Sequence, residues 1–209
     1  MSPRPTRRPF PVLPVAIGAI AVVAAIGIAI AASGGEEDPS SPADVAAFGP
    51  VVVEGTPLPE LGDGPDPAVG QPAPTAEGLD PDDEPVTLGR PGQPTLVAFL
   101  AHWCPHCQAE LPRLVSLMEA GDLEGVRMVA VLTGTDANAP NYPPVAWLER
   151  EGWSGEVLLD DDQGSAATAY GRSGYPFIVA LDADGTVVDR RSGERTREEV
   201  LAMAAAAQG

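Results

Sequence analysis

Lysine is absent from this 209-residue chain, and basic residues of any kind are scarce. The 12 cations are all arginines and face 30 Asp and Glu residues, so the formal net charge is -18. No basic patch is large enough to displace counterions from phosphates, which excludes a nucleic-acid-binding protein. The excess of carboxylates instead predicts a solubilising acidic surface.

Cysteine is almost as scarce, and its placement excludes a scaffold built on several disulfides. Cys104 and Cys107 are the only two cysteines, and a bridge between them would close a loop of four residues. Closing so short a loop removes little chain entropy, so a purely structural disulfide is disfavoured. A C-x-x-C pair between a strand pattern and a helix pattern is typical of a redox site.

Long hydrophobic runs are also absent, with one exception near the N-terminus. Residues 12–32 contain no charge and, as a helix, would be about 31 Å long, which matches a hydrocarbon core of about 30 Å. Residues 1–11 carry arginines and no acid, so the positive-inside rule predicts a cytoplasmic N-terminus and an extracytoplasmic remainder. The alternative is a signal peptide cut after Ala29-x-Ala31, although its apolar segment usually has about 7 to 15 residues. We therefore predict an uncleaved, single-pass signal anchor at residues 12–32.

Composition divides the rest of the chain into a tether, an extension and a domain. Residues 33–47 are acidic and lack apolar periodicity, which predicts a flexible tether. Residues 48–85 form an N-terminal extension, in which 48–54 are a short β-branched run typical of an edge strand. Residues 55–85 are rich in proline and predict an extended loop. The folded domain is predicted for residues 86–209.

Alternating strand and helix patterns predict an α/β fold for this domain. The apolar run 95–101 shows no alternation, as expected for a central strand covered on both faces. Helix 104–119 has one apolar face and is interrupted by Pro112, and Thr196-x-x-Glu199 is a capping box that opens the last helix. The remaining strands are expected at 85–88, 126–133, 156–159, 176–181 and 186–191, and the remaining helices at 143–152, 165–170 and 196–207. This order predicts a mixed central sheet with helices on both faces.

The stretch around the cysteines contains the candidate catalytic residues. Cys104 is expected at the start of the helix, where unpaired N–H groups and the helix dipole stabilise a thiolate, so it is the predicted nucleophile. Cys107 lies one turn into the helix and is expected to resolve the mixed disulfide. Pro105 suits the first helical turn, and His106 can donate to the Cys104 sulfur, which makes the disulfide more oxidising. Trp103 directly precedes the pair and is expected to form a substrate-facing wall.

The same stretch permits one alternative, a metal site. Four possible ligands for zinc or copper lie close together, namely His102, Cys104, His106 and Cys107. All four fall within six residues, and a turn from strand to helix would splay them apart. A copper-handling protein therefore stays the second hypothesis for the function, and we predict no metal and no cofactor at this site.

Short motifs between residues 69 and 185 form a specific set, and the similarity that they carry extends to about residue 205. They are Val69-Gly70-Gln71-Pro72-Ala73-Pro74, Trp103-Cys104-x-x-Cys107, Glu110-Leu111-Pro112, Val157-Leu158-Leu159-Asp160, Ala169-Tyr170-Gly171, Gly174-Tyr175-Pro176 and Asp182-x-Asp184-Gly185. Together they resemble the thioredoxin superfamily, and within it the membrane-anchored thiol–disulfide oxidoreductases of the TlpA/ResA type. The resemblance implies a thioredoxin-like fold and an extracytoplasmic enzyme that exchanges disulfides with partner proteins.

The resemblance also implies which residues face the dithiol. In this family the peptide bond at the position of Tyr175–Pro176 is cis and lies opposite the cysteines. The Tyr175 backbone would then meet an incoming protein, which docks as an added strand. Trp103, Tyr175 and Pro176 are therefore the predicted substrate-binding residues.

Departures from the family pattern concern proton transfer and the direction of the reaction. Thioredoxins carry a buried acid six residues before the first cysteine, where this chain has Ala98, and their helper lysine is missing. Proton transfer from Cys107 must then use water, His102 or another group. The Pro105-His106 pair resembles the strongly oxidising DsbA type, whereas the overall layout resembles the reductases. We favour the reductase and keep a DsbA-like oxidase as the alternative direction.

Overall fold

A computed structural model describes residues 47–209 of the chain. The predicted anchor at residues 12–32 and all but the last residue of the predicted tether at 33–47 lie outside this range. Within residues 47–209, no helix combines the length and the apolar character that a membrane crossing needs.

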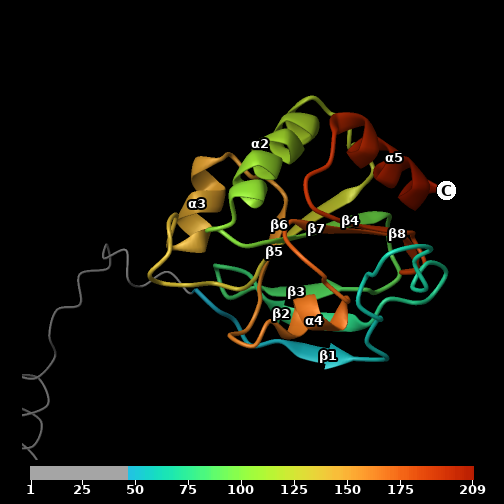
Figure 1. The fold of residues 1–209 in the computed structure, drawn as a ribbon, viewed down its shortest axis with the longest axis horizontal. Coiled ribbons are helices and arrows are strands. Elements are labelled where there is room, and N and C mark those ends of the chain that lie inside the picture. The colour runs from blue at the N-terminus through green and yellow to red at the C-terminus, as the bar shows by residue number, and fades with distance from the viewer. Residues whose placement is uncertain (1–46) are drawn as a thin grey trace, which may run out of the picture. The chain divides into compact units, whose positions relative to one another are not determined.

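A mixed sheet forms the centre of the described part, in the strand order β1-β2-β6-β5-β4-β7-β8, with β3 paired to β2 (Figure 1). Strand β4 runs parallel to β5 and antiparallel to β7, so the predicted mixed sheet is confirmed. The strands are β1 Val52–Glu54, β2 Thr75–Leu79, β3 Pro85–Leu88, β4 Thr95–Leu100, β5 Arg127–Leu132, β6 Glu156–Leu159, β7 Phe177–Leu181 and β8 Val187–Ser192. The helices are α2 Pro105–Glu119, α3 Pro144–Arg150, α4 Ser165–Ala169 and α5 Arg197–Gln208.

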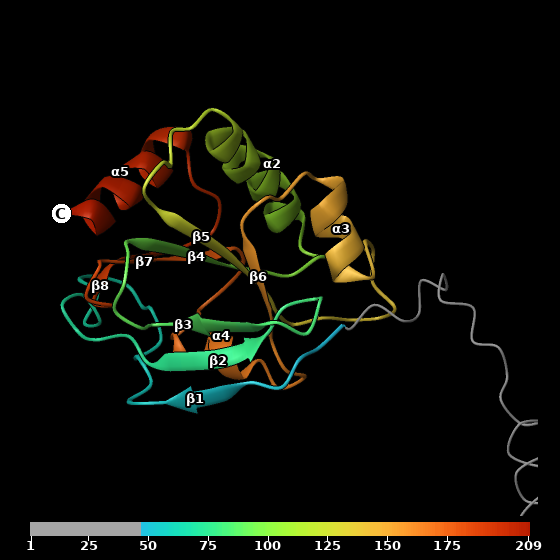
Figure 2. The same cartoon turned by 180° about the vertical axis from the view of Figure 1, so that it is seen from behind.

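The central strand β4 is apolar throughout because both of its faces are covered. Successive side chains of a strand point to opposite faces. Leu96, Ala98 and Leu100 pack into the core beneath α2, α3 and α5, whereas Val97 and Phe99 pack into a second core with α4. Figures 1 and 2 show α2, α3 and α5 on one side of the central strands and α4 on the other. The prediction of helices on both faces is thus confirmed.

One predicted loop was wrong, because residues 55–85 contain the strand β2. Its sequence T-A-E-G-L is poor in β-branched residues, so the local pattern does not indicate a strand. It nevertheless pairs with both β1 and β3. A Cβ at Gly78 would lie 3.1 Å from Cγ of Leu158, so this glycine packs closely against the neighbouring strand β6. Strand formation at this position depends on tertiary contacts rather than on propensity.

The proline-rich segment that precedes β2 is fastened to the sheet by a buried arginine. Arg190 of β8 is 2% exposed, and its Nε donates to Oδ2 of Asp66 at 2.8 Å. Its Nη1 donates to the carbonyl oxygens of Pro59 and Tyr170, each at 2.9 Å. A buried guanidinium is tolerated only when its donors are satisfied, so this contact holds the extension against the domain.

Candidate active site

The dithiol lies at the junction of β4 and α2, as predicted. Cys104 is the N-cap residue of α2, and Pro105 is its first residue. Cys104 is 6% exposed, whereas Cys107 is fully buried, and both are free thiols. The Cys107 sulfur accepts a hydrogen bond from the Ala101 N–H at 3.5 Å, and burial raises the pKa of this thiol far above its usual range. Cys104 is therefore the more exposed of the two cysteines, and burial favours the protonated form of Cys107.

The peptide between Tyr175 and Pro176 faces Cys104. This peptide is cis, as the resemblance implied, and the Tyr175 carbonyl oxygen lies 3.8 Å from the Cys104 sulfur. Tyr175 is half-buried, and burial raises the pKa of its hydroxyl. The backbone just before β7 thus forms the wall opposite the dithiol.

Trp103 forms a second, aromatic part of this wall. Its side chain is partly exposed, and its indole N–H donates to the Gly134 carbonyl at 2.7 Å. The rings of Trp103 and Tyr175 meet edge to face with centroids 6.0 Å apart. Gly134 has φ of +61°, and a Cβ there would lie 2.7 Å from the Tyr175 hydroxyl, so this position requires glycine.

His102 is buried, and both of its ring nitrogens are bound to backbone groups. Its Nδ1 lies 2.7 Å from the Pro140 carbonyl oxygen, which can only accept, so Nδ1 carries the proton. Its Nε2 accepts from the Asp136 N–H at 3.2 Å. The neutral ring therefore fixes the loop after β5 through these two hydrogen bonds. It has no free nitrogen to take a proton from Cys107 or to bind a metal.

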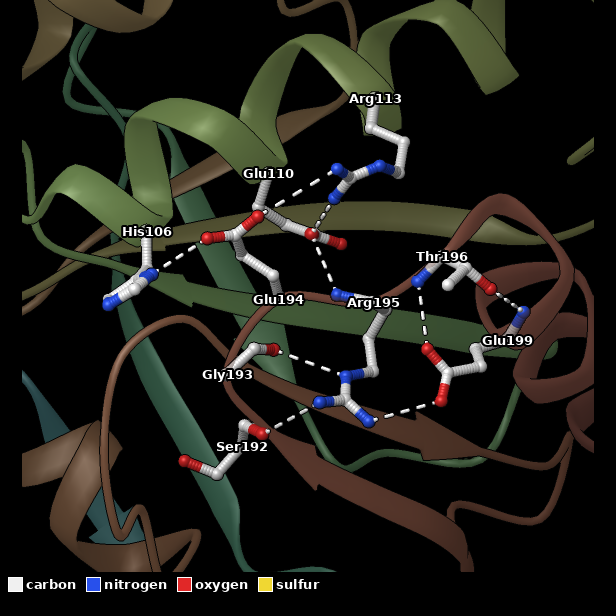
Figure 3. Close-up of polar contacts among 9 residues, drawn as sticks. All are labelled: His106, Glu110, Arg113, Ser192, Gly193, Glu194, Arg195, Thr196 and Glu199. Carbon is white, nitrogen blue, oxygen red and sulfur yellow. Dashed lines mark hydrogen bonds and ion pairs between the residues drawn. The ribbon is translucent and has the colours of Figure 1, made fainter.

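Glu110 is the site residue that sequence reasoning missed. It lies one turn after Cys107 on α2 and is completely buried. One carboxylate oxygen accepts from the Arg195 N–H at 2.9 Å and from Arg113 at 2.5 Å, but the other oxygen has no hydrogen-bond partner (Figure 3). Burial raises the pKa of this carboxyl despite the two donors. A glutamate on the same helix face as Leu111 and Leu114 was the signal in the sequence.

His106 points toward an acid on the loop after β8 rather than being left free. Its Nδ1 lies 2.7 Å from a carboxylate oxygen of Glu194, and the other oxygen of Glu194 is 3.9 Å from Arg113 (Figure 3). Arg113 in turn binds Glu110. A chain of polar contacts through Glu194 and Arg113 therefore connects the residue between the two cysteines with the buried Glu110.

The predicted site residues fall into two groups. Trp103, Cys104, Tyr175 and the following proline come together as one surface, with Cys107 directly beneath it. The four possible metal ligands do not converge, because His102 is bound to backbone and His106 to Glu194. Across residues 47–209, no three His, Cys, Asp or Glu side chains are grouped to hold a metal ion.

Chemically, this arrangement suits two-step disulfide exchange. An accessible sulfur at a helix N-terminus can form a mixed disulfide. A second thiol one turn away can then attack that disulfide, provided that a base accepts its proton. Glu110 offers an unpartnered oxygen for this purpose.

Comparison with known proteins identifies related chains. The family model described as redoxin matches residues 68–206. The thiol:disulfide interchange protein DsbE of Allochromatium vinosum is 31% identical over 152 residues, which cover 69% of this chain and 80% of that protein. The thiol-disulfide oxidoreductase ResA of Bacillus anthracis is 28% identical over 109 residues, covering 52% of this chain and 60% of that protein. For several other curated relatives, the matched stretch is little more than half of their length.

Solved structures agree on the fold. A putative thiol:disulfide interchange protein DsbE from Chlorobium tepidum has a TM-score of 0.58 at 24% identity, covering 68% of this chain and 98% of that one. The thioredoxin-like fold and the resemblance to ResA-type oxidoreductases are thus confirmed. With its family model matched over residues 68–206, this chain belongs to the redoxin family.

Proposed function

We propose that the chain is an extracytoplasmic thiol–disulfide oxidoreductase that reduces disulfides of partner proteins. The observation that carries this proposal is the asymmetry of the two thiols. Cys104 retains 6% exposure and faces the Tyr175 carbonyl, whereas Cys107 is fully buried, and the buried Glu110, whose charge acts on Cys107, follows one helical turn later with one unpartnered oxygen. This asymmetry separates the attacking sulfur from the resolving one.

The reaction follows from these positions. The Cys104 thiolate attacks one sulfur of the partner disulfide, and the other sulfur leaves as a thiol after taking a proton. The Cys107 thiol then transfers its proton to Glu110, and its sulfur attacks Cys104 of the mixed disulfide. The second partner thiol leaves, so the partner gains two electrons and two protons, and the enzyme ends as the Cys104–Cys107 disulfide.

The pairing of His106 supports the reductive direction. An imidazolium beside Cys104 would stabilise the thiolate and make the disulfide more oxidising. Here the Glu194 carboxylate lies 2.7 Å from the ring, so its negative charge would offset a positive charge on that ring. The C-P-H-C motif is therefore less oxidising in this setting than with a free histidine.

The location of the enzyme is inferred from the sequence. The uncharged run 12–32 follows an arginine-bearing N-terminus, which favours a single-pass anchor with the catalytic domain outside the cytoplasm. Protein thiols and disulfides in that compartment are the proposed partners, because it permits disulfides to persist.

Equilibration of the Cys104–Cys107 pair with a glutathione redox buffer tests the direction. We expect a potential closer to that of thioredoxin, about -270 mV, than to that of DsbA, about -120 mV. The oxidised fraction would be measured by alkylation of free thiols and mass spectrometry. A potential near the DsbA value would contradict the reductive assignment.

Trapping of mixed disulfides tests the roles of the two cysteines. We expect Cys107→Ser to accumulate mixed disulfides with a disulfide-containing protein, because Cys104 attacks and nothing resolves the product. Cys104→Ser is the matched control and should trap none, since Cys107 is buried. Equal trapping by both variants would show that the roles are assigned wrongly.

A further inference from the structure

Arg172 differs from the other arginines of residues 47–209 because its guanidinium forms neither an ion pair nor a hydrogen bond within that range. The others form ion pairs with carboxylates, except Arg150, which donates to Asn141 and the Ala146 carbonyl. No ion pair or side-chain hydrogen bond of Arg172 exists within the described residues, and its Nε is buried without an acceptor. In a chain of net charge -18, a half-buried cation without a carboxylate is unexpected.

Tyr175 holds this cation beside the dithiol. The guanidinium carbon of Arg172 lies 4.4 Å from the centroid of the Tyr175 ring. The same ring meets Trp103, and the Tyr175 carbonyl faces Cys104. Stacking on an aromatic face leaves the in-plane N–H donors of a guanidinium unused, and since Nε is buried, the two Nη groups are the donors that remain for a partner.

The carboxylate of Asp160, which also acts electrostatically on Tyr175, does not neutralise Arg172. Asp160 is buried, and its carboxylate accepts from the backbone N–H groups of Asp161, Ala166 and Ala167. Those bonds hold the carboxylate at the start of α4. The charge of Arg172 is therefore available to a group from outside the described chain.

We propose that Arg172 is a specificity-determining residue that binds a carboxylate of the partner protein. That carboxylate belongs to the residue next to the partner cysteine that reacts with Cys104. The proposal rests on the proposed thiol–disulfide exchange, in which the partner lies along the Tyr175 backbone. The planar fork of arginine matches a carboxylate with two parallel hydrogen bonds, which lysine cannot reproduce. The acidic surface repels acidic partners at long range, so this preference comes from direct contact.

Reduction of matched peptide disulfides tests the proposal. Three symmetric disulfide-linked peptides would differ only in the residue next to cysteine, which is Glu, Gln or Arg. In each reaction the reduced enzyme gives two electrons and two protons to the peptide disulfide and releases two peptide thiols. For the unmodified chain we expect kcat/KM for the Glu peptide to exceed that for the Gln peptide about fivefold, with the Arg peptide slowest.

Variants separate this contact from general damage to the site. Arg172→Gln should reduce the Glu to Gln ratio to about one, and Arg172→Lys should give an intermediate ratio. Arg191→Gln, which removes an exposed cation from β8, should leave the ratio unchanged. Since each ratio compares two substrates of one variant, a loss of overall activity cancels.

Salt provides a test that needs no variant. Raising the ionic strength from about 0.01 M to about 1 M should bring the ratio of the unmodified chain close to one, because exposed charge pairs are screened. A ratio of one at low salt, or a preference for Glu that persists in Arg172→Gln, would overturn the role of Arg172 while leaving the proposed function intact. Failure to reduce any of the three peptides would instead contradict the proposed function.

Discussion

At the scale of single residues, we propose that the buried Glu110 on α2 takes the role of the acid that thioredoxins carry on the central strand. Thioredoxins place that acid on the central strand, where this chain has Ala98, packed in the core. Glu110 supplies a carboxylate from the helix instead, one turn after Cys107. Because the pKa of Cys107 is raised by burial, resolution needs a nearby base. The raised pKa of Glu110 makes this carboxylate a stronger base than an exposed one.

Replacing Glu110 tests its role as the proton acceptor. Glu110→Gln should slow the attack of Cys107 on a mixed disulfide by about 10²-fold at pH 7, the usual contribution of a general base. The rate would be measured as release of a fluorescent thiol from Cys104. In the variant, the rate should rise with pH until hydroxide replaces the missing base. Glu119→Gln, an exposed acid at the end of the same helix, is the control, and an equal loss there would contradict the assignment.

Glu194 allows a test of how charge beside the dithiol sets its potential. Glu194→Gln keeps the size of the side chain but removes the negative charge next to His106, so a positive charge on the ring would act on Cys104 without compensation. We expect the potential to become less negative by about 10 to 20 mV, as is typical of an exposed ion pair. Equilibration with glutathione measures the change. A shift in the opposite direction would show that Glu194 acts by positioning the ring rather than by offsetting its charge.

At the scale of elements, the link between the extension and β8 depends on one buried ion pair. Arg190 has a fully buried side chain and binds Asp66, whose pKa is lowered mainly by this hydrogen bond. A carboxyl with a lowered folded-state pKa stabilises the fold fully above its unfolded pKa, about 3.9, and the stabilisation is lost as the pH falls from there through the folded-state pKa. The segment should thus detach in acid before the central strands unfold.

Breaking this pair should be costly at neutral pH. Asp66→Asn leaves the Arg190 charge buried and unpaired, so we expect a loss of about 3 to 5 kcal/mol in the free energy of unfolding at pH 7. Urea denaturation at pH 7 and pH 3 measures it, and the difference from the unmodified chain should shrink at pH 3. The control is Asp122→Asn, which breaks a more exposed pair with Arg197 and should cost less than about 1 kcal/mol. Equal costs for both variants would contradict the assignment.

At the scale of the whole molecule, the proposed function requires the dithiol to be outside the cytoplasm. Residues 1–11 carry three arginines directly before the uncharged run 12–32, as the positive-inside rule expects of a single-pass protein with a cytoplasmic N-terminus. We expect the full chain to stay in the membrane fraction after a high-salt wash. A membrane-impermeant thiol reagent added to intact cells should label Cys104. Recovery of a shortened chain in the soluble extracytoplasmic fraction would instead indicate that a signal peptide is cut after Ala31.

Local patterns were enough to predict the dithiol, its place at a helix start and the order of most elements. Each of these features depends on residues close together in the chain, such as the run 95–101 followed by the two cysteines, or the capping box at Thr196. A spacing of two residues places Cys107 one turn into α2 whatever the rest of the fold does. The predicted roles of the cysteines follow from that local geometry.

Long-range packing was needed for the features that tune the site. His106 and Glu194 are 88 residues apart in the chain, and Glu110 meets the Arg195 backbone across 85 residues. Neither contact leaves a periodic signal, because each arises when the loop after β8 packs against α2. The same holds for Arg172, which is one more surface arginine until the fold stacks it on Tyr175 and leaves it without a carboxylate. Periodicity records which face of an element is buried, but it does not record which charges the assembled faces bring together.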